Sequence, residues 1–113
     1  MMRLVTVLAA LSGAIAVAAG AFAAHGASGQ AAEWLKTGGQ YQLIHAVAAL
    51  VAVRMGERIS PWLFVAGGAL FAGTLYAMAF GGPRWFGAIT PIGGVALIAG
   101  WLCMALTAWR RAA

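Results

Sequence analysis

The sequence predicts an all-α protein: a four-helix transmembrane bundle with a short interfacial helix between the first and second spans. Hydrophobic residues make up 64% of the 113 residues and charged residues only 8%, a composition outside the range of soluble globular domains. The apolar residues form long uncharged runs, and the alternating strands of a membrane barrel are absent, so helices are the expected spanning elements. The whole chain, residues 1–113, is expected to form one domain.

The first two spans are predicted over residues 4–24 and about 40–55. As a helix the first run would be about 30 Å long, enough to cross the hydrocarbon core. The second run is shorter and begins with polar residues, so its span is expected to be slightly short or oblique. An alternative for the first run is a secretory signal, because "AFAA" resembles a cleavage site after Ala23. Cleavage there would leave only the later spans.

The third and fourth spans are predicted over residues 61–80 and 91–109. Ser60 can cap the third helix with Pro61 at its first position, and the "GGP" that follows Phe80 stops it. Thr90 and Pro91 repeat the same start for the fourth helix. The alternative is a kinked helix that begins at Trp85.

The distribution of Lys and Arg predicts that both termini are cytoplasmic. With the N-terminus inside, the cytoplasmic basic residues are Arg3, Arg54, Arg58, Arg110 and Arg111. Only Lys36 and Arg84 are then outside. Four tryptophans near predicted span ends are interpreted as interfacial anchors, namely Trp62, Trp85, Trp101 and Trp109.

The stretch between the two histidines is the longest in which the chain is less apolar. Within it, "AAEWLK" (residues 31–36) predicts a short helix lying in the membrane interface, with Gly29 and the pair Gly38 and Gly39 as hinges. This arrangement would place His25 and His45 in the same outer leaflet.

An outer-half polar cluster centred on His45 is the candidate binding site. An ionisable side chain below the membrane surface normally faces the protein interior or a cavity. The simplest interpretation of His45 is a neutral imidazole hydrogen-bonded to Tyr76 or to a backbone carbonyl. The alternative is binding of a small ligand, a lipid head group or a proton. The candidate residues are His25, Tyr41, Gln42, His45, Tyr76, Arg84 and Thr90.

Other functional classes have little support in the sequence. No aspartate is present to orient a histidine, Ser12 lies deep in the first span without a nearby base, and Ser28 and Ser60 lie at span boundaries, so an enzyme is not expected. Cys103 lies in an apolar run and is interpreted as packing. The isolated basic residues do not indicate nucleic acid, and neither a metal site nor a cofactor is predicted.

Small residues recur at spacings of three and four in the first, third and fourth spans. They predict close packing within the chain, with homodimerisation through the same faces as the alternative. Together with the very short loops, they favour an accessory subunit of a larger membrane complex. Ligand binding at the His45 cluster is the second hypothesis.

Four motifs resemble one known family. They are "GAFAAHG" (20–26), "YQLIHA" (41–46), "GGALFAGTLY" (67–76) and "RWFGAITPIGGVALIAGW" (84–101). In this order they resemble the small inner-membrane proteins of domain of unknown function 423, the YgdD and transmembrane protein 256-like family. The resemblance implies an inner-membrane location, four spans and an uncleaved first helix, but it implies no reaction. The family pattern falls on His25, Gly26, Tyr41, His45, Gly73, Tyr76, Arg84, Thr90, Pro91, Gly93, Gly94 and Gly100.

Overall fold

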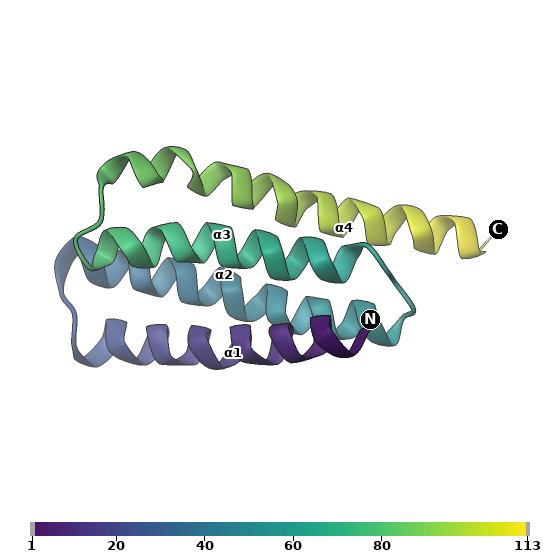
Figure 1. Ribbon diagram of the computed structural model, residues 1–113, viewed down its shortest axis with the longest axis horizontal. Helices are drawn as coiled ribbons and strands as arrows, with labels where there is room; N and C mark the ends of the chain where they lie inside the picture. Colours follow the sequence, from purple (N-terminus) through teal and green to yellow (C-terminus); the bar gives the residue numbers. More distant parts are fainter. Residues whose placement is uncertain (1, 113) are drawn as a thin grey trace.

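The computed structural model describes residues 2–112, and helices account for almost all of them (Figure 1). The elements are α1 (Met2–His25), α2 (Gly29–Arg54), α3 (Ser60–Ala79), the 3₁₀ helix η1 (Arg84–Ala88) and α4 (Thr90–Ala112). No strand occurs in this part of the chain. The all-α prediction with four long helices is confirmed.

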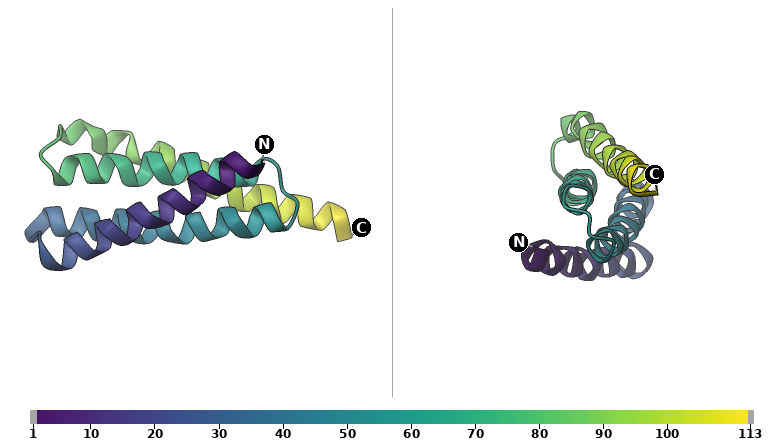
Figure 2. Two further views of the ribbon diagram at one scale, coloured as in Figure 1. Left: turned by 60° about the horizontal axis from the view of Figure 1, so that its bottom comes forward. Right: turned by 90° about the vertical axis from the view of Figure 1, so that its right-hand side faces the viewer.

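Each helix packs on the next in the chain: α1 on α2, α2 on α3, and α3 on α4. Viewed end-on, the helices form a curved layer in which α3 lies between α2 and α4 (Figure 2, right). Both termini lie at the same end of the bundle, and the last turns of α4 extend beyond the other helices (Figure 1). Because α4 packs mainly on α3, its face toward α2 is left partly uncovered.

Small residues make the helix contacts close. A Cβ on Gly93 would lie 2.5 Å from the backbone nitrogen of Phe71, so the backbones of α3 and α4 nearly touch there. On the other side of the bundle, a Cβ on Gly39 would lie 3.1 Å from the carbonyl oxygen of Ala16 in α1. Such approaches provide the dispersion contacts that hold helices together in lipid, where hydrophobic burial does not. At these positions the prediction of intrachain packing is confirmed.

The expected short helix between the first two spans is not a separate element. Residues 31–36 form the first turns of α2, which continues without a break to Arg54. Leu35 is only 2% exposed, so this segment packs into the bundle instead of lying on a surface. Gly38 and Gly39 are not hinges, because they sit inside a regular helix where a ring of Tyr76 and the backbone of α1 approach them.

Helix ends agree with most of the signals in the sequence. Pro61 lies in the first turn of α3, and that helix ends before Gly81, whose φ of +98° suits glycine. Ser60 does not cap α3: Ile59 occupies the cap position, and the Ser60 hydroxyl donates to Glu57 instead. Helix α4 begins at Thr90 and not at Trp85, because residues 84–88 form the separate η1.

Three segments are long and apolar enough to cross a membrane. They are α1, α3 and residues 84–111, with mean hydropathies of 2.2, 1.6 and 1.9. Helix α2 is as long as these but carries more polar residues and does not meet the same criterion.

Candidate functional site

A groove opens between α2 and α4, with α3 as its floor. Its volume is about 470 Å³. The lining residues are Tyr41, His45, Phe71, Gly94, Leu97, Ile98 and Trp101. The groove exists because α4 packs on α3 and has little contact with α2. It is therefore open to the side of the bundle.

His45 is buried in the wall of this groove, with 7% of its surface exposed. Its Nδ1 lies 2.6 Å from the carbonyl oxygen of Tyr41, one turn earlier in α2. Trp101 of α4 donates its indole N–H to His45 Nε2 over 3.0 Å. Since Nε2 accepts, Nδ1 must carry the proton that is donated to the carbonyl. The imidazole is therefore neutral, with its tautomer set by two partners.

Aromatic rings surround the imidazole. The Phe64 centroid lies 5.7 Å from the imidazole centroid, and Trp101 meets the imidazole edge-on at 5.8 Å. Tyr41 lies roughly parallel to His45 at 6.2 Å and contacts Phe71 at 4.6 Å. These separations are in the range of favourable aromatic pairs. The groove thus has aromatic walls contributed by α2, α3 and α4.

The backbone-carbonyl interpretation of His45 is confirmed, whereas Tyr76 is not its partner. Tyr76 donates to Gln42 Oε1 over 2.7 Å, and its ring lies against Gly38. Thr90 is also paired elsewhere: its hydroxyl lies 2.6 Å from that of Thr74, which ties α4 to α3. The expected cluster is therefore divided into three separate polar contacts.

Two residues of the expected cluster lie away from the groove. His25 ends α1 and Arg84 begins η1, and both side chains are exposed. His45 is sixteen residues from the start of α2, or about 24 Å along the helix, so it lies closer to the Arg54 end. The expectation that the two histidines share one leaflet assumed a helix starting near residue 40; α2 starts at Gly29, which increases the distance along the helix, and the shared leaflet stays a prediction.

Trp101 is the groove residue that its sequence pattern does not reveal. It is predicted to be an interfacial anchor; in the structure its indole N–H is directed into the bundle, while 46% of its surface stays exposed. Its distance of 56 residues from His45 leaves no local pattern that links the two. In residues 2–112 no group of three or more His, Cys, Asp or Glu side chains is placed to hold a metal ion.

Comparison with known proteins identifies the family. The family model described as a protein of unknown function (DUF423) matches residues 19–94. The UPF0382 inner membrane protein YgdD of Escherichia coli K12 is 42% identical over 119 aligned residues, which cover 96% of this chain and 91% of YgdD. The chain belongs to the DUF423 family. The resemblance of its four motifs to this family is confirmed.

Other relatives carry similar descriptions. A UPF0382 membrane protein of Haemophilus influenzae is 42% identical, with 87% of each chain covered. YwdK of Bacillus subtilis is 35% identical and covers 95% of this chain and 97% of its own. No solved structure matches this DUF423 protein. These relatives support a membrane location, and their descriptions assign no activity.

Proposed function

We propose that this DUF423 protein is a four-span, non-enzymatic membrane protein that binds a planar, largely apolar molecule from the bilayer. The observation that carries the proposal is the lateral groove with aromatic walls around the His45–Trp101 hydrogen bond. Its volume of about 470 Å³ lies within the usual range of small-molecule sites.

The surface of α2 supports a fourth span. Its 26 residues would extend about 39 Å. The polar side chains of Gln42 and His45 are buried and hydrogen-bonded within the bundle. Its exposed residues between Tyr41 and Arg54 are apolar and would face lipid: Leu43, Ile44, Val47 and Val51. A helix of this kind can cross the hydrocarbon core although its average hydropathy is modest.

The lining of the groove favours a flat ring over a flexible chain. Tyr41, Phe71 and Trp101 present ring surfaces, and aromatic contacts favour offset-stacked or edge-on partners. Gly94 adds a position without a side chain at which a ring can approach α4. The lining residues include no carboxylate, thiol or aliphatic hydroxyl, so the groove is suited to binding and not to covalent chemistry.

The test is native mass spectrometry of the protein released gently from its own membrane. The variant Gly94→Leu fills the groove, whereas Gly73→Leu places the same side chain on α3 in open space. We expect wild type and Gly73→Leu to carry the same small molecule, and Gly94→Leu to lose at least about 90% of it. Equal occupancy in all three proteins would contradict the proposal.

A second candidate function is that of an accessory subunit. Ala69 and Gly73 are exposed one turn apart on α3, and nothing lies within 4 Å of a Cβ built on Gly73. Small residues at this spacing allow a helix of another protein to approach closely in lipid. In the same spectra, a protein partner of fixed stoichiometry that Gly73→Leu removes and Gly94→Leu retains would favour this candidate.

A further inference from the structure

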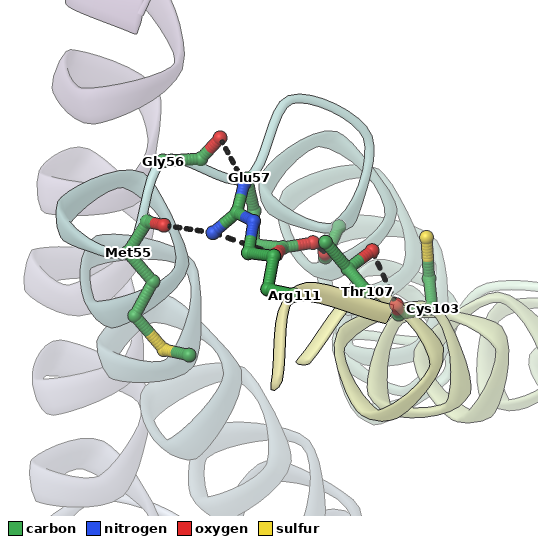
Figure 3. Close-up of polar contacts among 7 residues, drawn as sticks. Met55, Gly56, Glu57, Cys103, Thr107 and Arg111 are labelled. Carbon is green, nitrogen blue, oxygen red and sulfur yellow. Dashed lines mark hydrogen bonds and ion pairs between the residues drawn. The ribbon is translucent and has the colours of Figure 1, made fainter. Parts of the chain in front are cut away.

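A second polar site lies at the opposite end of the bundle from η1, where the loop between α2 and α3 meets the last turns of α4. At its centre is Glu57, a carboxylate that is only 4% exposed (Figure 3). Gly56 has a φ of +81°, which lets the loop turn and direct the next residue inward. Ser60 donates its hydroxyl to Glu57 Oε1 over 3.0 Å.

The second carboxylate oxygen, Oε2, is buried and accepts no hydrogen bond. Arg111 of α4 approaches it to 3.7 Å, but the guanidinium is directed to the loop backbone. It donates to the carbonyl oxygen of Met55 over 2.5 Å and to that of Gly56 over 3.3 Å. A buried charged oxygen without a hydrogen-bond donor is energetically costly. A ligand that donates to Oε2 would remove this cost.

A pocket of about 260 Å³ adjoins this carboxylate. It is lined by Gly56, Glu57, Arg58, Ile59, Cys103, Thr107 and Arg111. One buried negative charge thus lies beside two arginines. A free anion would be repelled by Glu57, and a metal cation would be repelled by the guanidinium groups. A ligand that carries both charges matches the pocket.

We propose that this pocket binds a group with a primary ammonium and a phosphate, the chemistry of an aminophospholipid head group. The ammonium donates to Glu57 Oε2, and the phosphate is held by Arg58 and Arg111. The position fits a lipid, because Arg54 ends α2, Arg58 lies in the loop that follows, and Arg110 and Arg111 lie in the last turn of α4. Such a group of basic residues marks a membrane–water boundary. Free ethanolamine phosphate presents the same groups without acyl chains.

The experiment titrates the delipidated full-length protein in detergent with three phospholipids of identical acyl chains, followed by native mass spectrometry. Phosphatidylethanolamine supplies both groups, phosphatidylcholine lacks ammonium protons, and phosphatidylglycerol lacks the amine. We expect wild type to bind phosphatidylethanolamine about tenfold more tightly than the other two. Free ethanolamine phosphate is added as competitor: displacement assigns the site to the head group alone, and its failure assigns it to the intact lipid.

Three variants decide whether the binding occurs at this pocket. Glu57→Gln keeps an acceptor for Ser60 but places an amide at Oε2, so the preference for phosphatidylethanolamine should disappear. Arg58→Gln alters only an exposed side chain, tests the phosphate contact without disturbing the core, and should weaken binding. Arg110→Gln is the matched control, since Arg110 does not line the pocket. Equal binding of the three lipids, an unchanged preference for phosphatidylethanolamine in Glu57→Gln, or an unchanged affinity in Arg58→Gln would overturn the proposal.

Discussion

At the scale of single residues, the hydrogen bond between Trp101 and His45 is the contact that most defines the groove. It joins α2 and α4, which have few other contacts, and it determines which imidazole nitrogen carries the proton. Both ring nitrogens already have hydrogen-bond partners, so neither is free to bind a ligand. The side chain acts as a fixed wall of the site.

Removing the indole donor should destabilise the bundle. Trp101→Phe keeps an aromatic ring but leaves His45 Nε2 buried without a donor. We expect the free energy of unfolding to fall by roughly 1–2 kcal/mol, in line with hydrogen bonds between membrane helices. The measurement is unfolding in mixed micelles with increasing sodium dodecyl sulfate.

The control for this change is Trp109→Phe, because Trp109 is 78% exposed and should tolerate the substitution within about 0.5 kcal/mol. A double-mutant cycle with His45→Phe isolates the pairwise energy. Strict additivity of the two single substitutions would show that the hydrogen bond contributes nothing.

At the scale of helices, glycines set how closely α4 approaches α3. Gly93 and Gly94 are neighbours with different surroundings. A Cβ on Gly93 would meet the backbone of Phe71 at 2.5 Å, whereas a Cβ on Gly94 would be 3.8 Å from the Phe71 ring. The first position is at the contact between helices, and the second faces the groove.

This pair predicts opposite effects for the same substitution. Gly93→Ala should force α4 away from α3 and lower the free energy of unfolding by about 1–3 kcal/mol, as overpacking does elsewhere. Gly94→Ala should be neutral or slightly stabilising, because alanine favours a helix over glycine by up to about 1 kcal/mol. The same detergent unfolding assay compares them. Equal stabilities would mean that the two helices are not in close contact.

The helices themselves were largely predictable, and the reasons are local. Runs of uncharged residues set the lengths of α1, α3 and α4, while Pro61, Pro91 and Gly81 mark helix boundaries. The start of α2 was not predictable in this way. Its first turns are polar enough to suggest an interface, and only the packing of Leu35, and of the glycines that follow, incorporates them in the bundle.

The same difference between local signals and long-range packing applies to the candidate sites. The bond from His45 to the carbonyl of Tyr41 spans one helical turn, so the spacing alone made it foreseeable. Trp101 and Arg111 each reach partners more than fifty residues away, and no periodic pattern reveals such contacts. Glu57 is missed for another reason, because an acidic residue in a short loop usually stays in water.

At the scale of the whole molecule, the decisive question is whether α2 crosses the membrane. Four spans place the α1–α2 connection and the α2–α3 connection on opposite sides, with both termini at one end of the bundle as in Figure 1. With four spans, the excess of Lys and Arg predicts that this end is cytoplasmic. If α2 did not cross, the two connections would face the same side.

Cysteine labelling in spheroplasts separates these arrangements. With Cys103→Ala as background, Ala27→Cys reports the first connection and Arg58→Cys the second, since both positions lie in loops. We expect a membrane-impermeant maleimide to label Ala27→Cys and to spare Arg58→Cys until the membrane is opened with detergent. Labelling of Arg58→Cys alone would keep four spans but invert the orientation. Labelling of both positions in intact spheroplasts would exclude α2 as a span, and the groove at His45 would then no longer be bounded by two membrane-crossing helices.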